Sequence, residues 1–456
     1  MANPPETSSQ TAVTVIGAGL SGSEAAWQLA ERGIAVRLVE MRPAVMGPAH
    51  HSGDFGELVC SNSLKNEDPG TAAGLLKHEL TKLGSVVLDV ARATRVPAGS
   101  ALAVDREEFS AEITRRVSGH PLVTVVRAEA DAIPSGRVII ATGPLTSAKF
   151  EPAVAALAGS AGLAFYDAAA PIVASETIDR SIVFAASRYE KGEGPDYLNA
   201  PMNRDEYAAF HEALVGARRV TTKEFERADL FQACQPVEEV ARTGPDALRF
   251  GALKPVGLTD PRTGQRPWAV VQLRAENAAL TAYNLVGFQT NLAFGEQERV
   301  FRMIPGLRDA EFFRHGVMHR NTFVDAPRLL DATLAVRDRP LVRLAGQLTG
   351  TEGYMEAAAS GMLAALNTWA DIVGAQPVVL PITTALGSLI AYATDPDTDP
   401  YQPMHVNFGL VPPLSQRVRG KRERYAAYSQ RAQRDLADWL DTRPDAAIVP
   451  GRRSDG

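Results

Sequence analysis

AVTVIGAGLSGSEAAWQLAERG, residues 12–33, is the stretch that decides the fold. It starts with an apolar β-branched run, residues 13–16, of the kind found in buried parallel strands. Three glycines follow at the spacing G-x-G-x-x-G, and an alanine-rich helical pattern then runs to Gly33, a residue type that commonly ends helices. A second apolar run ends at the acid Glu40. This order predicts a Rossmann-like dinucleotide-binding unit.

Each glycine of the turn has a physical role. Gly17 allows the tight turn, Gly19 lets the backbone approach a pyrophosphate, and Gly22 lets helix and strand pack closely. The helix N-terminus offers free N–H groups to phosphates, and Glu40 can accept hydrogen bonds from a ribose. A glycine-rich turn in another kind of α/β protein is the alternative. The predicted cofactor-binding residues of this unit are Gly17, Ala18, Gly19, Leu20, Ser21, Gly22, Glu40, Met41 and Arg42.

Length and composition limit the class of protein. The chain has 456 residues, enough for two domains, and a net charge of −6, so a nucleic-acid partner must be met by a local basic patch. Its 2 cysteines, Cys60 and Cys234, exclude a disulfide framework, a Cys₄ zinc site and a C-x-x-C pair. The low cysteine content fits a reducing cytoplasm, and we expect no metal. We expect no membrane partner either, because no apolar run of about 18 residues occurs.

Two later apolar stretches, predicted as strands, are also followed by glycines. Residues 138–143, VIIATG, would return the chain to the cofactor, with Gly143 allowing close approach. Residues 341–345 precede GQLTGTEGY and a small-residue helix, which repeats the opening logic. An ordinary strand-to-loop connection is the alternative for each. From the second stretch we predict cofactor contacts by Gly346, Thr349, Gly350, Glu352, Gly353 and Tyr354. No second G-x-G-x-x-G follows a strand, so a nicotinamide reductant would only visit.

The fold class expected is α/β, a Rossmann-like domain with an inserted mixed α/β domain. The first domain would comprise residues 12–187 and 300–412, interrupted by the insert at 188–299. A basic C-terminal helix is expected at 413–440, and residues 1–11 and 445–456 read as disordered tails.

The predicted C-terminal helix carries seven basic residues and one acid between residues 415 and 434. Most charge runs are solvated helix faces, but the contrast with the acidic chain also permits RNA contact. The RNA-binding candidates are Arg417, Arg419, Lys421, Arg422 and Arg424.

Five blocks together carry a resemblance. They are VIGAGLSGSEAAWQ with VEMRP, LVCSNSLK around Cys60, FQACQPVE around Cys234, GQLTGTEGYMEA and NFGLVPPL. Over nearly the whole chain they resemble the bacterial folate- and FAD-dependent tRNA (uracil-5-)-methyltransferases, the TrmFO family, distant relatives of the glucose-inhibited-division-type flavoproteins. The resemblance implies FAD as cofactor, methylenetetrahydrofolate as carbon donor, NAD(P)H as transient reductant and a T-loop uridine of tRNA as substrate.

The chemistry of that reaction assigns roles to the cysteines. A thiolate that adds to uracil C6 makes C5 nucleophilic. Cys234, in the predicted insert, is the expected nucleophile, and Pro236 would stiffen its loop. Glu238 would orient the base or move a proton. Cys60 would lie against the flavin, and it is the alternative nucleophile. A buried packing thiol remains the alternative for both cysteines.

Other functions compete with this one. A small-molecule flavin oxidoreductase or amine oxidase would leave the basic run as a surface feature. A wobble-uridine tRNA-modifying flavoprotein, or a non-catalytic flavoprotein in a tRNA-modifying complex, would also bind RNA. The sequence does not place a folate pocket. Tyr354 is a candidate stacking residue, and the weaker candidates are His319, Arg320 and Asn321, for which structural hydrogen bonds or packing are the alternative.

Overall fold

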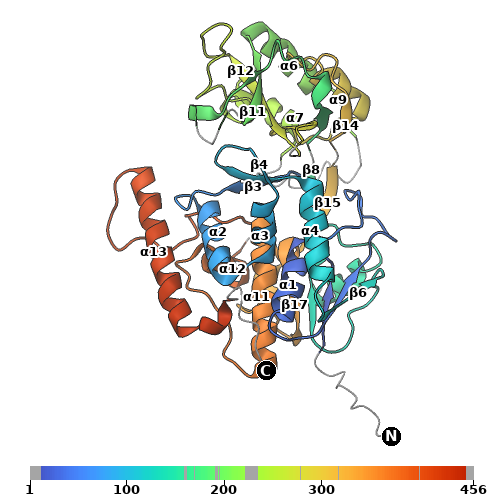
Figure 1. Ribbon diagram of the computed structural model, residues 1–456, viewed down its shortest axis with the longest axis vertical. Coiled ribbons are helices and arrows are strands. Elements are labelled where there is room, and N and C mark those ends of the chain that lie inside the picture. The colour runs from blue at the N-terminus through green and yellow to red at the C-terminus, as the bar shows by residue number, and fades with distance from the viewer. Residues whose placement is uncertain are drawn as a thin grey trace.

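The computed structural model describes the chain in two bodies joined by short strands (Figure 1). It covers residues 12–158, 162–168, 170–190, 194, 196–220, 235–277, 279–316, 318–399 and 401–447, with only the backbone at 158, 162–168, 190 and 318–321. Among these described residues, no helix is long and apolar enough to cross a lipid bilayer.

The first body is built on the predicted parallel sheet. Its strand order is β16-β17-β7-β1-β2-β6, and only the edge strand β16 runs antiparallel to its neighbour. The apolar run after the N-terminus forms the central strand, paired to β2 and β7 on either side. The strands are β1 (Val13–Ile16), β2 (Val36–Glu40), β6 (Val123–Arg127), β7 (Val138–Ile140), β16 (Ala335–Val336) and β17 (Arg339–Leu344).

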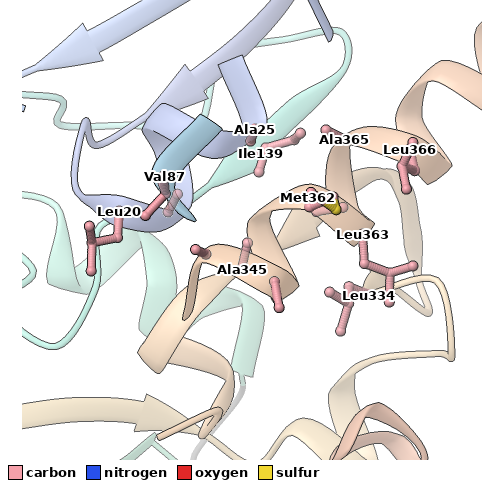
Figure 2. Close-up of a cluster of buried hydrophobic side chains, with 14 of the residues drawn as sticks. Leu20, Ala25, Val87, Ile139, Leu334, Ala345, Met362, Leu363, Ala365 and Leu366 are labelled. Carbon is pink, nitrogen blue, oxygen red and sulfur yellow. The ribbon is translucent and has the colours of Figure 1, made fainter. Parts of the chain in front are cut away.

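Helices cover this sheet, and two of them meet over its centre. The helix of the glycine turn, α1 (Leu20–Ala30), lies against the late helix α11 (Tyr354–Val373). A side chain at Gly361 would place its Cβ 2.1 Å from the Ser21 carbonyl oxygen, so small residues allow this close approach. Figure 2 shows Ala25, Ile139, Met362 and Ala365 gathered at the contact. The start and the end of the first domain are therefore packed together.

Other helices surround this pair (Figure 1). They are α2 (Ala72–Leu83), α3 (Val86–Ala93), α4 (Arg106–Ser118), α5 (Glu151–Ala158), α10 (Ala326–Leu329), α12 (Ala385–Thr394) and α13 (Lys421–Thr442). A small sheet of β3 (Ser63–Asn66), β5 (Ala101–Val104) and β4 (Arg95–Val96) lies on the side of the first body that faces the second.

The second body has its own antiparallel sheet and its own hydrophobic core. The strand order is β10-β11-β12-β13-β9-β14. The bounds are β9 (Ile172–Ala174), β10 (Phe184–Ala185), β11 (Tyr197–Met202), β12 (Ala269–Ala275), β13 (Ala282–Leu285) and β14 (Phe312–Arg314). The helices are α6 (Arg204–Gly216), α7 (Val237–Arg242), α8 (Ala247–Phe250) and α9 (Phe294–Phe301). This confirms an inserted mixed α/β domain.

The predicted limits of the insert, 188 and 299, are wrong. Buried residues from Ala170 to Ala310 share the second core, and strands β9 and β14 outside those limits belong to its sheet. The chain crosses between the bodies through an antiparallel pair, β8 (Gly162–Ala168) and β15 (Met318–Val324). Short apolar strands look alike in sequence whichever sheet they join, so only the pairing locates the boundary.

The C-terminal region also differs from the prediction. Residues 413–420 are not helical, and α13 starts only after Gly420, whose φ is 86°. Beyond the helix, Pro444–Ala446 form a 3₁₀ turn in which Ala446 is buried, and the Arg32 guanidinium donates to the Ala446 carbonyl oxygen at 2.9 Å. The start of the predicted disordered tail is thus packed on the first domain.

Candidate functional site

The glycine turn has the geometry that its spacing predicts. Gly17 has a φ of 96°, and a Cβ there would lie 2.6 Å from the Ala141 carbonyl oxygen. A Cβ on Gly22 would lie 1.8 Å from the Gly17 carbonyl oxygen, so only glycine fits where the helix meets the strand. A Cβ on Gly19, by contrast, meets no protein atom within 4 Å. The turn is closed on the protein side and open at Gly19, where α1 begins.

A pocket of about 530 Å³, partly open to solvent, lies beside this turn. It collects the carboxyl ends of the parallel strands, which is where open α/β sheets bind ligands. Of the predicted cofactor-binding residues, Gly17, Gly19, Glu40, Met41 and Arg42 line it. An exposed glycine turn, a helix N-terminus and a carboxylate in one pocket fit a dinucleotide.

Glu40 is held in place by protein donors. Its Oε2 accepts from the Ala18 amide at 2.7 Å, and its Oε1 accepts from the Arg42 amide at 3.0 Å and from Arg42 Nε at 2.8 Å. Burial by itself raises the pKa of Glu40, but the hydrogen bonds and charge of Arg42 outweigh it and keep the pKa below its ordinary value. The carboxylate stays ionised, and Oε2 keeps a lone pair for a ribose hydroxyl.

Several pocket residues were not predicted from the sequence. They follow the ends of β6 and β7 or lie in the loop after β2. The sequence ATG at the end of β7 indicated that the chain returns to the cofactor there, but it did not identify these residues. They are His50, Ala128, Glu129, Ala130, Thr142, Leu145, Thr146, Ser147 and Phe150. The predicted Gly143 lies among them in sequence; its φ is 66°, and a Cβ there would meet no atom within 4 Å.

The second glycine turn lies beside the first, but protein atoms explain its glycines. A Cβ on Gly346 would be 3.0 Å from the Ser21 Cβ, and one on Gly350 would be 2.3 Å from the Tyr401 hydroxyl. A Cβ on Gly353 would meet Glu356 Oε2 at 2.2 Å. The number of glycines therefore does not by itself require a cofactor at this turn.

The polar members of that turn bond to one another. Thr349 and Thr351 both donate to the Gly346 carbonyl oxygen at 2.8 Å, and Glu352 accepts from Gln347 at 2.6 Å. The Ser21 Oγ next to them is buried without a hydrogen-bond partner among the described residues. Cofactor contacts by Gly346, Thr349, Gly350, Glu352 and Gly353 remain a prediction.

Tyr354, at the start of α11, positions the loop that carries Cys60. Its hydroxyl accepts from the Cys60 amide at 2.8 Å and from the Ser61 amide at 3.1 Å. Burial raises the pKa of Tyr354, so the hydroxyl stays protonated. The Tyr354 hydroxyl therefore has a structural role, because it connects the second glycine turn to the loop that contains Cys60.

Three arginines lie close enough to Cys60 to interact with it electrostatically, although they are far apart in sequence. Arg106 lies at the start of α4, and Arg274 and Arg314 come from strands β12 and β14 of the second domain. Each interacts electrostatically with Cys60. Cations beside a thiol favour its thiolate form. Sequence reasoning missed this cluster because no local pattern links the three residues.

The same arginines join the two domains. Arg274 donates to Asn62 Oδ1 at 2.8 Å and to Ser61 Oγ at 2.7 Å, and Arg314 donates to the Val59 carbonyl oxygen at 2.7 Å. Arg106 donates to the Leu58 carbonyl oxygen and to Glu276 Oε2. The loop around Cys60 is therefore the joint between the domains.

A pocket of about 1270 Å³, open to solvent, lies at this joint. Residues of both domains line it, among them His51, Arg106, Glu276, Phe313 and Arg314. Its wall is adjacent in sequence to the nucleotide pocket, since His50 lines one and His51 the other. Among the described residues, the buried Glu276 Oε1 has no hydrogen-bond partner, which suits a ligand with N–H or O–H donors.

Replacing Cys60 tests whether this thiol acts in the site. We expect Cys60→Ala to lower the methyl transfer that the sequence resemblance implies about tenfold or more, and to shift the absorption spectrum of bound flavin, because the sulfur that interacts with these three arginines is lost. Cys60→Ser, which keeps the size and polarity of the group, is the matched variant. An alanine variant with unaltered spectrum and unaltered activity would leave only a packing role for Cys60.

Cys234 lies outside the described residues, and its role stays a prediction. The described chain resumes at Gln235, and the Val237 amide donates to the Gln289 carbonyl oxygen at 2.7 Å as α7 begins. His319, Arg320 and Asn321 lie on β15, whose backbone is described without their side chains.

The role predicted for Glu238 is wrong. Its side chain is fully buried, Oε2 accepts from Thr290 Oγ1 at 2.8 Å, and Oε1 accepts from the Asn291 amide at 2.7 Å. Burial raises the pKa of Glu238, and these hydrogen bonds partly oppose the rise. A carboxylate enclosed in this way cannot touch a substrate base. Glu238 is a positioning residue that anchors the segment following Cys234.

The predicted basic residues are exposed at the start of α13. Arg417 and Arg419 precede the helix, and Lys421, Arg422 and Arg424 lie in its first turn. Within the described part of the chain, none of the five forms an ion pair with an acidic side chain. The helix packs on the rest of the protein through Tyr425 and Tyr428, whose rings contact the ring of Phe408. Its basic end is thus free to meet an anionic partner.

Comparison with known proteins agrees with this geometry. The family model for glucose inhibited division protein A matches residues 12–376. The structure of Aquifex aeolicus GidA is similar in fold, with a TM-score of 0.67 at 16% identity, covering 96% of this chain and 77% of that one. The Rossmann-like domain with its insert is therefore the fold of that family.

Two curated relatives are similar over almost their full length. The methylenetetrahydrofolate–tRNA-(uracil-5-)-methyltransferase TrmFO of Moorella thermoacetica is 56% identical over 421 residues, 92% of this chain and 96% of the relative. The TrmFO of Symbiobacterium thermophilum is 56% identical over 431 residues, 94% of this chain and 96% of the relative. The chain therefore belongs to the glucose inhibited division protein A family and, within it, to the TrmFO family of methylenetetrahydrofolate–tRNA-(uracil-5-)-methyltransferases.

Proposed function

We infer that this protein methylates C5 of a T-loop uridine in tRNA, using methylenetetrahydrofolate as carbon donor and reduced FAD as hydride donor. The observation that carries the inference is the 56% identity to TrmFO over 92% of the chain. The two pockets, which come together at the neighbouring residues His50 and His51, support it, since the reaction needs a dinucleotide cofactor and two further substrates in one place.

The nucleotide pocket has the groups that FAD needs. The open backbone at Gly19 and the N-terminus of α1 would receive the pyrophosphate, and Glu40 would bind the ribose. FAD, when bound and reduced, supplies a hydride. The protein would hold this cofactor at the carboxyl ends of the strands of the first sheet, in the pocket beside the glycine turn.

Thiol addition explains why the enzyme needs a cysteine. C5 of uracil is a poor nucleophile, and addition of the Cys234 thiolate to C6 moves electron density to C5, which can then attack the methylene carbon of the folate. Loss of the C5 proton and departure of tetrahydrofolate leave an exocyclic methylene. Hydride addition to that methylene expels the thiolate from C6 and gives the methyl group. Cys60 is the second candidate for the thiolate.

The pocket at the domain joint suits the folate. Arg314, which forms no ion pair within the described residues, would supply positive charge for a folate carboxylate, whereas Arg106 is already paired with Glu276. The second oxygen of Glu276, Oε1, offers an acceptor to the ring N–H groups. The exposed ring of Phe313, with 55% of its surface accessible, is available for stacking. Stacking by the Tyr354 ring stays a prediction, while its hydroxyl is bonded to the Cys60 loop.

Two finer points belong to this proposal. NAD(P)H would reduce the flavin as a visitor, because the sequence has only one glycine unit of the resident dinucleotide type. The substrate tRNA and the two-cysteine composition favour the cytoplasm.

The direct test is transfer of label from methylenetetrahydrofolate to unmodified tRNA. We expect label at C5 of the T-loop uridine, dependent on reduced flavin. Label at a wobble uridine instead would support the related wobble-modifying activity. Flavin turnover with small amines and no label in RNA would support a small-molecule oxidase.

Charge reversal at the start of α13 tests its RNA contact. We expect the variant with Arg417→Glu, Arg419→Glu and Arg422→Glu to bind tRNA at least about tenfold more weakly and with a flatter salt dependence, because phosphate contacts are lost. Flavin content should not change, since the segment lies away from the nucleotide pocket. An unchanged tRNA affinity would mean that the run is only a solvated surface.

A further inference from the structure

A second basic surface lies on the inserted domain, away from both pockets described above. It is a groove of about 1340 Å³, open to solvent, between the start of α6, the loop after α8 and the start of β12. Four arginines and one tryptophan mark it, and we call it the Arg–Trp groove. These residues are Arg204, Arg249, Arg262, Arg266 and Trp268.

The tryptophan anchors the groove. The Arg249 guanidinium carbon lies 3.6 Å from the centre of the Trp268 ring, and that of Arg204 lies 5.4 Å from it. Arg249 Nε also donates to the Trp268 carbonyl oxygen at 3.1 Å, and its NH1 pairs with Asp246 at 2.6 Å. Stacking on the ring holds two guanidinium groups at one edge of the domain.

The positive charge of this groove is not balanced. Two of the four arginines are paired, Arg249 with Asp246 at 2.6 Å and Arg262 with the buried Asp260 at 2.8 Å. The other two, Arg204 and Arg266, are exposed and form no ion pair within the described residues. Only two carboxylates, Glu206 and Asp260, line the groove beside its four arginines. In a chain with a net charge of −6, such a local excess indicates an anionic partner.

An aromatic side chain follows the groove residue Arg249 on α8. Phe250 has 82% of its surface exposed, the largest value among the exposed large hydrophobic side chains of the described chain. Phe250 does not line the groove itself but lies beside it in sequence. Proteins bind RNA backbones with unpaired arginines and stack unpaired bases on exposed aromatic rings.

The groove is aligned with the Cys60 site along two strands. In the β11–β12 pair, Tyr197 lies opposite Arg274, and Met202 lies opposite Ala269. Arg274 contacts the Cys60 loop, while Trp268 immediately precedes β12 at its other end. Six steps of extended chain lead from Trp268 to Arg274, a distance of about 20 Å. A tRNA arm that places a base at the joint is long enough to reach the groove with its backbone.

We propose that the Arg–Trp groove binds the sugar-phosphate backbone of tRNA, at a second contact separate from the start of α13. The proposal rests on the proposed function, because it assumes that tRNA is the substrate. Arg204 and Arg266 contact phosphates, and Arg249 with Trp268 fixes the shape of the groove. The contact increases affinity for RNA without touching the reacting atoms.

The test uses the double charge reversal Arg204→Glu and Arg266→Glu in the flavin-loaded protein. We expect tRNA affinity to fall about tenfold or more, and the slope of log K against log salt to flatten by about 1.5, because each lost phosphate contact removes about 0.7 to 0.9. The charge-retaining variant Arg204→Lys and Arg266→Lys should keep most of the affinity and slope.

The matched control reverses Arg37 and Arg339 to glutamate. Both are exposed without an ion pair in the described chain, and both lie at the amino ends of strands β2 and β17, at the sheet edge opposite the nucleotide pocket. This control changes net charge equally, so it should bind tRNA nearly as the wild type does. Flavin content and the midpoint of thermal unfolding verify that each variant is folded.

The outcomes separate this proposal from the function itself. If the wild type neither binds nor methylates tRNA, the proposed function fails. If the wild type does both and the Arg204/Arg266 reversal binds with the affinity and salt slope of the control, the groove does not contact RNA. An equal loss in the lysine variant would also overturn the proposal, because phosphate contacts depend on charge.

Discussion

Cys234→Ala is expected to abolish methyl transfer and to eliminate the covalent complex with RNA. The substrate is a small T-loop RNA carrying 5-fluorouridine, whose fluorine cannot leave C5 as the proton does. The thiolate adduct at C6 therefore accumulates, and wild-type protein should give a complex that survives denaturation. Denaturing gel electrophoresis with labelled RNA measures it.

The two cysteines provide the control for each other. Cys60→Ala should still form the covalent complex, because its thiol is predicted to lie against the flavin and not at the uracil. If Cys234→Ala forms the complex as readily as wild type and Cys60→Ala does not, then Cys60 is the nucleophile. The arginines around Cys60 make that outcome chemically sound, since they favour a thiolate there.

Gly19→Leu is expected to remove FAD from a folded protein. Gly19 has a φ of −70° and a ψ of −167°, a conformation open to any residue, and a Cβ there meets no protein atom within 4 Å. The new side chain would instead fill the space that the pyrophosphate needs. We expect at least about a hundredfold loss of flavin affinity, measured as the flavin absorbance that remains after gel filtration.

Gly244→Leu is the matched control. It is also open, with no atom within 4 Å of its Cβ position, but it lies in the second domain and does not line the nucleotide pocket. It should keep full flavin content. A Gly19→Leu protein with an undiminished flavin spectrum would show that the cofactor lies elsewhere.

Gly17 and Gly22 are less suitable for this test. Their Cβ positions lie 2.6 Å and 1.8 Å from backbone oxygens, so substitution would disturb the strand–helix turn itself. Flavin loss in such variants would report folding as much as binding. The structure thus explains why the middle glycine of the turn is the informative one.

Features that depend on residues close together in the sequence could be predicted, and features that depend on residues far apart in the sequence could not. The first domain was predictable because its signals are local: residues 13–16 are β-branched, the glycine spacing sets a turn, and Glu40 ends the next strand. The insert was recognised as a change in sequence character, but its limits were missed by more than ten residues. Strands β9 and β14 carry no local mark of the sheet that they join.

The sites show the same division. Glu238 was expected at the substrate because it follows Cys234 closely in sequence, yet its partners are Thr290 and Asn291, more than fifty residues away. The arginines around Cys60 come from three elements spread from residue 106 to residue 314. A role predicted from closeness in sequence, as for Glu238, was wrong. Roles predicted from the residue type itself, as for the glycines of the turn, agree with the backbone geometry.

By itself, the sequence determined the nucleotide-binding turn, because the positive φ at Gly17 and the close approach of Gly22 to the Gly17 carbonyl oxygen within the same turn both require glycine. It also determined the family through blocks spread over the chain. Only the tertiary structure decided what surrounds Cys60, whether Glu238 is accessible, and that Arg204 and Arg249 share one tryptophan. Burial and charge at those positions come from side chains that the fold brings together from distant segments, and no local pattern encodes such contacts.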